Sequence, residues 1–208
     1  MAEQYISAFA IDADVFLGMA GSHDDALVRA ALGGIEELTE AGGLLRATEA
    51  AEVEPALREI ITGRLDPSRP GGYVWLLELL GPTAGDPLGS VVLPGRGWHR
   101  LRKAFRAWGL TALADLWGRC WTFPWRDAAP DPDPWPFPVL ASKADLDRLR
   151  AELAGFDLDR IHADHRLLPG GDDDVEEVAW LVGDMLPAWV DGARGRGREL
   201  LVLRDGGR

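Results

Sequence analysis

The most uniformly apolar stretch of the chain runs from Gly72 to Gly81. Its sequence is GYVWLLELLG, in which seven apolar side chains surround one charged residue, Glu78. An element that is apolar on every side is buried on every side. The stretch is too short to cross a bilayer, which needs about 20 apolar residues. We therefore expect a central core helix at Tyr73 to Leu80, with the other elements packed around it.

Amphipathic helical patterns recur along most of the remaining chain. Apolar residues spaced by three and four predict helices within 25–38, 53–61, 98–108, 111–119, 146–156 and 175–189. S-x-x-D signals that begin at Ser22 and Ser142 predict capped N-termini, and Pro55 is expected in the first turn of its helix. A kink or a close crossing is predicted at Gly33 and Gly34, and a kink is predicted at Pro187, which would collide with the carbonyl of residue 183.

Short strands are predicted near both ends of the chain. Residues 5–11 alternate between two faces, and Glu199 to Arg204 form an apolar run that is a strand candidate able to pair with them. Residues 90–93 predict a further short strand. The fold class is therefore α+β: one mainly α-helical domain over residues 1–208, with six to eight helices and a small sheet that includes residues 4–11 and 199–204.

A proline-rich arm interrupts this pattern at residues 127–138. Proline stands at every second position from 130 to 138, which favours an extended, polyproline-like segment over a helix or an inner strand. Trp121, Phe123 and Trp125 alternate just before it and predict an extended aromatic face. Two roles remain open for the arm: a docking or pocket-forming element, or a cover for the protein's own core.

Composition narrows the function classes. The net charge of −12 and the pI near 4.7 argue against a nucleic-acid partner, because phosphate contacts need surplus Lys and Arg. An acidic surface suits a basic protein partner or simply solubility. A single cysteine, Cys120, cannot form an internal disulfide, and the N-terminus lacks a signal-peptide pattern. We expect a cytoplasmic protein without a transmembrane segment.

A locally basic helix stands out within this acidic chain. Between Arg96 and Arg106, five of 11 residues are Lys or Arg, and an aromatic stripe lies on the other face. The pattern fits anion binding, an acidic partner or an anionic membrane surface, whereas the alternative is pairing with the protein's own carboxylates. An anion site with a tryptophan-lined pocket would use Arg96, Trp98, Arg100, Lys103, Trp121, Trp125 and Trp135.

Other candidate chemistry is sparse. Glu78 and His99 are candidates for an acid or base, because a buried carboxylate must be paired, hydrogen-bonded or protonated. His162 and His165 stand three residues apart among several aspartates and are weak candidates for a metal. No P-loop, G-x-S-x-G or H-E-x-x-H pattern occurs, and no cofactor is expected.

Four segments together resemble a family of uncharacterised bacterial proteins, a domain of unknown function. These segments are YISAFAID with the following GSHDDAL, ALREIITG, GYVWLLELLG and RGRELLVL. The likeness covers most of the chain and implies a single domain. Because the family has no established activity, the resemblance implies no functional residues.

Two functions from different classes follow from these observations. The leading hypothesis is a non-enzymatic interaction protein, immunity-like or regulatory, that meets another protein through its acidic surface or its arm. The alternative is an enzyme or small-molecule-binding protein with the Trp-lined pocket and an Arg-rich anion site.

Overall fold

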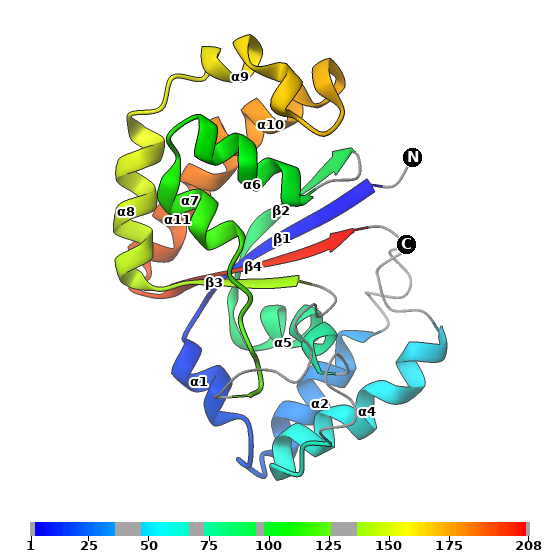
Figure 1. The fold of residues 1–208 in the computed structure, drawn as a ribbon. Coiled ribbons are helices and arrows are strands. Elements are labelled where there is room, and N and C mark those ends of the chain that lie inside the picture. The colour runs from blue at the N-terminus through cyan, green and yellow to red at the C-terminus, as the bar shows by residue number, and fades with distance from the viewer. Residues whose placement is uncertain (1–2, 36–46, 67–72, 95–97, 126–136, 207–208) are drawn as a thin grey trace. The chain divides into compact units, whose positions relative to one another are not determined.

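The computed structural model describes residues 3–35, 47–66, 73–94, 98–125 and 137–206, and all side chains within these ranges except those of 3–4, 47–50, 93–94, 98–100 and 205–206 (Figure 1). Two compact units divide the chain. Unit 1 comprises residues 1–10, 87–121 and 137–208, and unit 2 comprises residues 11–86 and 122–136. Helices dominate the described residues and a sheet accompanies them, so the predicted α+β class is confirmed.

A four-stranded antiparallel sheet organises unit 1. Its order is β2 (Asp86–Pro94), β1 (Glu3–Ile11), β4 (Glu199–Gly206) and β3 (Phe137–Ala141), as Figure 1 shows. On β3, Val139 lies opposite Val202 of β4. The predicted pairing of the two terminal segments is confirmed, because β1 and β4 are neighbours. β2 is longer than the predicted run at 90–93, and β3 was not predicted.

The proline content of the chain explains why β3 lies at an edge of this sheet. Pro138 has no backbone N–H to donate to a ladder, and proline is therefore confined to edge strands. The rest of the predicted arm, residues 127–136, lies outside the described residues. Just before the arm, the prediction of an extended aromatic face at Trp121, Phe123 and Trp125 is wrong. The backbone N–H of Trp125 donates to the carbonyl of Thr122 and closes a turn.

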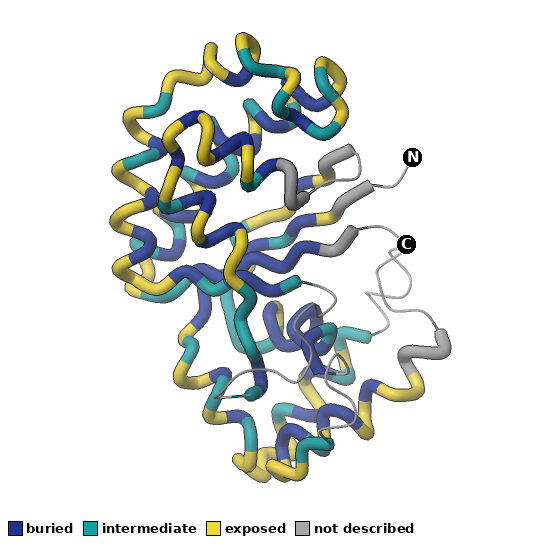
Figure 2. The backbone as a smooth tube through the Cα atoms, in the orientation of Figure 1, coloured by how far each residue is buried: buried dark blue, intermediate teal, exposed yellow. Residues whose placement is uncertain are grey.

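Helices cover one face of the sheet with a continuous apolar core. Alternate residues of the strands reach this core, which includes Ile6, Ala8, Ala10, Val139, Ala141, Leu200 and Val202. The covering helices are α6 (Trp98–Ala107), α7 (Thr111–Trp117), α8 (Lys143–Ala154), α10 (Val175–Trp180) and α11 (Leu186–Gly195). Each buries one stripe and exposes the other, as Figure 2 shows. Phe105 and Trp117 join α6 to α7 edge to face, with ring centroids 5.2 Å apart.

The N-termini of α8 and α7 are capped in different ways. On α8, Ser142 and Asp145 form the predicted capping box, which satisfies N–H groups within the helix itself. On α7, the N-cap residue Leu110 offers no side-chain acceptor. The Glu152 carboxylate of α8 accepts instead from the backbone N–H groups of Ala112 and Leu113, at 2.7 and 3.2 Å. The α7 N-terminus therefore depends on the packing of α8.

A π-helical segment lies before Pro187. Leu181–Met185 form this segment between α10 and α11, and Pro187 falls in the first turn of α11. A proline cannot donate to the carbonyl four residues before it and collides with that carbonyl in a regular α-helix. The wider π turn accommodates this defect at the place where the sequence predicts a kink.

Unit 2 contains the most apolar stretch of the chain. Its helices are α1 (Ala13–Gly18), α2 (Asp25–Gly33), α4 (Ala47–Thr62), the 3-10 helix η1 (Val74–Leu76) and α5 (Leu77–Ala84). The side chains from Tyr73 to Leu80 are buried apart from Trp75, which is partly exposed. The expectation that the whole fold packs around this stretch is wrong, because unit 1 builds its own core on the sheet.

Three local expectations in unit 2 also need correction. The N-cap of α2 is Asp24 rather than Ser22, whose hydroxyl accepts from the Asp24 N–H just before the helix begins. Helix α2 ends at Gly33 with Gly34 as its C-cap, so the helix does not kink there. A Cβ at Gly33 would meet nothing within 4 Å, so no described residue crosses closely at that glycine either. Pro55 lies inside α4 rather than in its first turn. Elsewhere in unit 2, the Asp12 side chain caps the N-terminus of α1.

Glycine is required where α4 ends. Gly63 has a φ of 69°, which favours glycine, and a Cβ there would lie 3.2 Å from the Cα of Gly21. The loop before α2 can therefore approach α4, and the Gly21 N–H donates to the Ile60 carbonyl at 2.9 Å.

We predict that Glu152→Ala lowers the free energy of unfolding of unit 1 by roughly 1 kcal/mol, the usual cost of a lost N-cap. Glu152→Gln should lose less, because its amide oxygen still accepts hydrogen bonds. Urea denaturation measures both, and hydrogen exchange at Ala112 and Leu113 localises the effect. Equal stability of all three proteins would contradict the capping role.

A second prediction concerns acid stability and Asp145. Burial alone would raise the pKa of this carboxyl, but hydrogen bonds from Ser142 and from the Arg119 guanidinium, 2.9 Å away, outweigh burial and lower the pKa. A depressed carboxyl pKa stabilises the fold above the unfolded value of about 3.9 and loses this effect as pH falls through the folded value. Asp145→Asn should therefore destabilise the protein at neutral pH, and the difference from wild type should shrink below about pH 4. Urea denaturation from pH 7 to pH 3 measures this, with exposed Asp173→Asn as the control.

Candidate protein-interaction surface

The basic helix α6 is part of the core of unit 1. Leu101, Phe105 and Trp108 of its apolar stripe are buried, Phe105 completely. A helix that lies on a membrane must present this stripe to lipid. The membrane-surface interpretation of α6 is therefore wrong.

Two of the described cations of α6 hold it to α7. The Arg102 Nε donates to the Ala114 carbonyl at 3.1 Å, and Arg106 pairs with Asp115 at the same distance. The Arg102 guanidinium also fills the space beside Gly118, where a Cβ would lie 2.3 Å from the Arg102 Cζ. These contacts favour the interpretation in which the basic charges serve the fold.

Of the three cations predicted for the anion site, only Lys103 has a side chain that the structure describes. Lys103 is exposed and makes no ion pair or hydrogen bond among the residues that the structure describes. Arg96 and Trp135 lie outside the described residues, as do the side chains of Trp98, His99 and Arg100. Trp121 belongs to unit 1, and its backbone N–H donates to the Pro138 carbonyl. Trp125 belongs to unit 2, so a common tryptophan-lined pocket stays a prediction.

Two ionisable side chains, the Glu78 carboxyl and the Tyr73 phenol, are buried in the core of unit 2. Glu78 is 8% exposed and takes part in a polar interaction, so it is not an isolated buried charge. The Tyr73 hydroxyl donates to Glu59 and accepts from the Asp66 N–H at 2.6 Å, and its ring meets Trp125 edge to face. Burial and the hydrogen bond to Glu59 raise the pKa of Tyr73 to about 12. Tyr73 is therefore a structural hydrogen-bond donor at neutral pH.

The two weak metal candidates lie close to each other in unit 1. His162 is in helix α9 (Asp159–Ala163), and His165 opens the 3-10 helix η2 (His165–Leu167). A His165 ring nitrogen lies 3.1 Å from the His162 carbonyl, and the other lies 3.6 Å from Asp172. Over the described residues, no group of three or more His, Cys, Asp or Glu side chains is arranged to hold a metal ion.

The acidity of the chain is concentrated in one segment of unit 1. Residues 157–184 contain nine Asp or Glu and two Arg, a net of −7 out of −12 for the whole chain. The segment forms α9, η2, the 3-10 helix η3 (Gly171–Asp174), α10 and the π-helical segment. Figure 1 shows α9, the 3-10 turns and α10 together at one end of unit 1.

Buried side chains and hydrogen bonds anchor the acidic segment 157–184 to the rest of unit 1. Ile161 and Leu168 are buried in the core, and the buried Asp174 accepts from the Gly170 N–H at 2.5 Å. Arg160 donates to the carbonyl of Trp108 at 2.8 Å, where α6 ends. Within the part of the chain that the structure describes, its positive charge thus serves a helix C-terminus and forms no ion pair with the neighbouring carboxylates.

Two large apolar side chains, Trp180 and Leu158, are exposed in the acidic segment. Trp180 is 46% exposed, between exposed Glu176 and Asp184 along the same side of the helix. Leu158, 39% exposed, lies next to this stripe, because a Cβ at Gly183 would be 2.8 Å from its Cδ1. We call Glu176, Trp180, Asp184 and Leu158 the Trp180 surface.

The position of Trp180 relative to the apolar stripe of its helix is the sequence signal for this surface, and the predictions made from the sequence did not include it. Val175, Val178 and Val182 define the buried stripe, and Trp180 falls outside that stripe. The carboxylates beside Trp180 are equally consistent with a favourable interaction with the helix dipole. The exposure of Trp180 is established only when the opposite face of the helix is known to be buried.

Comparison with known proteins identifies a family for the chain. Residues 2–204 match the model of the domain of unknown function DUF7691. The chain belongs to this family. The resemblance drawn from the four sequence segments is therefore confirmed. No curated protein and no solved structure matches the chain.

We predict that Arg102→Ala lowers the free energy of unfolding by about 1–2 kcal/mol, whereas Lys103→Ala changes it by less than about 0.5 kcal/mol. Arg102 loses both a hydrogen bond to a backbone carbonyl and its packing beside Gly118, and Lys103 loses neither. Calorimetric melting of the two variants, which carry the same charge change, separates the roles. Equal losses would mean that α6 contributes charge alone.

Proposed function

We propose that this chain is a cytoplasmic, non-enzymatic interaction module that binds a basic protein through the Trp180 surface. The observation that carries the proposal is a half-exposed tryptophan on an anchored helix, surrounded by the most acidic segment of the chain. Among the described residues, no helix is both long and apolar enough to cross a membrane.

Trp180 has the properties of an interface anchor. Tryptophan is enriched among the few residues that dominate binding energy, because its large ring orders few rotatable bonds when it is buried. Leaving an indole half exposed in a monomer keeps apolar area in water, which burial in a partner removes. The anchored helix beneath it limits the ordering cost of binding.

The carboxylates around Trp180 favour a partner that carries basic residues. Glu176 and Asp184 flank the indole directly, and the segment as a whole carries −7. Such a field attracts Lys and Arg and raises the association rate in a salt-dependent way. The complementary partner therefore presents an apolar pocket for the indole with basic residues around it.

The test begins with affinity purification from the native host and continues with the recovered partner in pure form. Trp180→Ala should raise its Kd about 30-fold, as expected for an aromatic hot spot. Val15→Ala removes another exposed apolar side chain, 54% exposed in unit 2, and should leave the Kd unchanged.

A second pair of variants tests the electrostatic part. The double variant Glu176→Lys with Asp184→Lys should slow association and flatten its dependence on salt. Asp14→Lys with Glu52→Lys makes the same charge change on exposed residues of unit 2 and should have little effect. A stoichiometric partner that binds Trp180→Ala with unchanged Kd would overturn the proposal, as would the absence of any such partner.

A further inference from the structure

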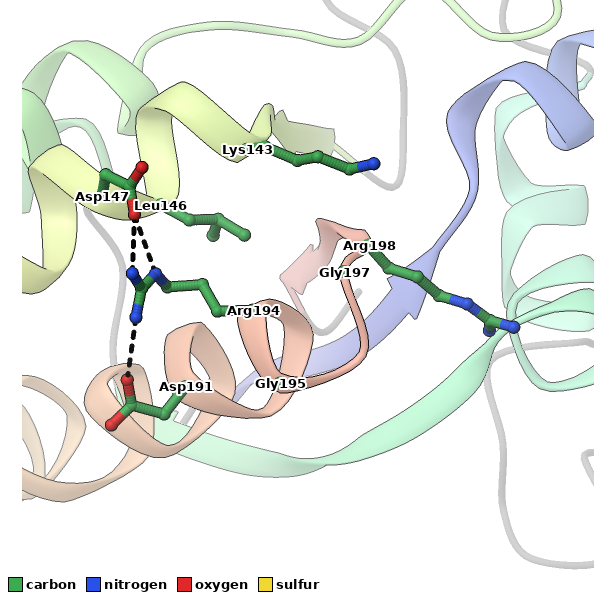
Figure 3. A pocket seen from close by; sticks show the side chains of 8 residues that line it. All are labelled: Lys143, Leu146, Asp147, Asp191, Arg194, Gly195, Gly197 and Arg198. Carbon is green, nitrogen blue, oxygen red and sulfur yellow. Dashed lines mark hydrogen bonds and ion pairs between the residues drawn. The ribbon is translucent and has the colours of Figure 1, made fainter.

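A surface pocket of about 510 Å³ lies in unit 1 away from the elements of the Trp180 surface. The first turns of α8, the last turns of α11 and the turn into β4 enclose it, as Figure 3 shows. Its volume is in the range of sites that hold small molecules. Its lining residues are Lys143, Leu146, Asp147, Asp191, Arg194, Gly195, Gly197 and Arg198.

The carboxylates of this pocket are already neutralised. Asp147 accepts from Arg194 at 2.8 and 2.9 Å. Asp191 pairs with Arg150 at 2.9 Å and lies 3.9 Å from Arg194. Figure 3 shows the ion pairs of Arg194 with Asp147 and Asp191 at one side of the pocket, with the Lys143 side chain extending away from them.

Lys143 gives the pocket surplus positive charge. Its side chain is exposed and makes no ion pair or hydrogen bond within the described part of the chain. It stands in the first turn of a 12-residue helix, where the helix dipole disfavours a cation. Asp147, four residues later, is its natural partner on the helix surface but is bound to Arg194. An anion bound at Lys143 would relieve this unfavourable placement.

Two glycines shape the pocket, and only one of them is needed for the backbone. Gly197 has a φ of 66° and ends α11 in a Schellman motif, with the Arg198 N–H donating to the Ala193 carbonyl at 3.0 Å. Gly195 is helical, and nothing lies within 4 Å of the place its Cβ would take. Any side chain at Gly195 would stabilise the helix and extend into open space at the pocket.

We propose that this pocket binds a small organic anion whose phosphate or carboxylate group contacts the Lys143 ammonium. The missing side chain of Gly195 leaves room for the body of the ligand. Arg198, at the turn into β4, completes the lining of the pocket. The site is separate from the protein-interaction function, so either proposal can fail alone.

The experiment is a titration of the full chain, followed by ¹H–¹⁵N NMR, with phenyl phosphate and with benzoate as probes. We expect saturable shifts of the Lys143, Gly195 and Gly197 amides with at least one probe. Comparison of the two distinguishes a phosphate site from a carboxylate site. Lys143→Gln should raise the Kd about tenfold, because a charge-assisted contact is lost. Lys103→Gln removes another exposed lysine, on α6, and should leave the Kd unchanged.

The glycine provides a second, independent variant. Gly195→Leu should abolish the shifts while the melting temperature stays the same or rises. Gly33→Leu makes the same change at the end of α2, where a Cβ also meets nothing within 4 Å, and should leave binding unchanged. Absence of saturable shifts with both probes, or equal Kd values for wild type and Lys143→Gln, would overturn the proposal.

Discussion

The strand β4 must be hydrogen-bonded on both edges and covered on both faces, because Leu200, Leu201, Val202 and Leu203 are all at most 2% exposed. Its neighbours are β1 and β3, which come from the N-terminus and from the middle of the chain. One buried strand thus brings together three distant parts of the sequence. The helices of unit 1 follow from it, since the apolar residues of one sheet face need a cover.

Polar side chains of unit 1 mostly complete backbone groups or join helices. Glu152 supplies the cap that the α7 sequence lacks, Arg160 reaches the carbonyl of Trp108 where α6 ends, and Arg102 reaches a carbonyl of α7. Such contacts between elements carry no signature in a local sequence window, because each partner comes from a different helix. They explain how an amphipathic helix rich in Lys and Arg can be a structural element rather than a binding one.

The charges that remain exposed are unevenly distributed. The acidic segment 157–184 surrounds Trp180, whereas the α8–α11 pocket combines neutralised carboxylates with the cation of Lys143. We therefore propose two kinds of partner for one net charge of −12: a basic protein for the first surface and a small anion for the second. Total charge alone says little about which ligand a given surface accepts.

The sequence by itself determined which residues are buried locally and where most helices begin or end. Period-two and period-3.6 patterns, the Ser142–Asp145 box and the Pro187 defect depend on neighbours within a few residues, so they are legible in one dimension. The sequence also showed the excess of acid. Tertiary structure alone decided that β3 joins β4, that Trp180 is left exposed and that Lys143 lies beside a pocket. These features depend on which elements pack together, and contacts between residues far apart in the chain leave no periodic trace in it.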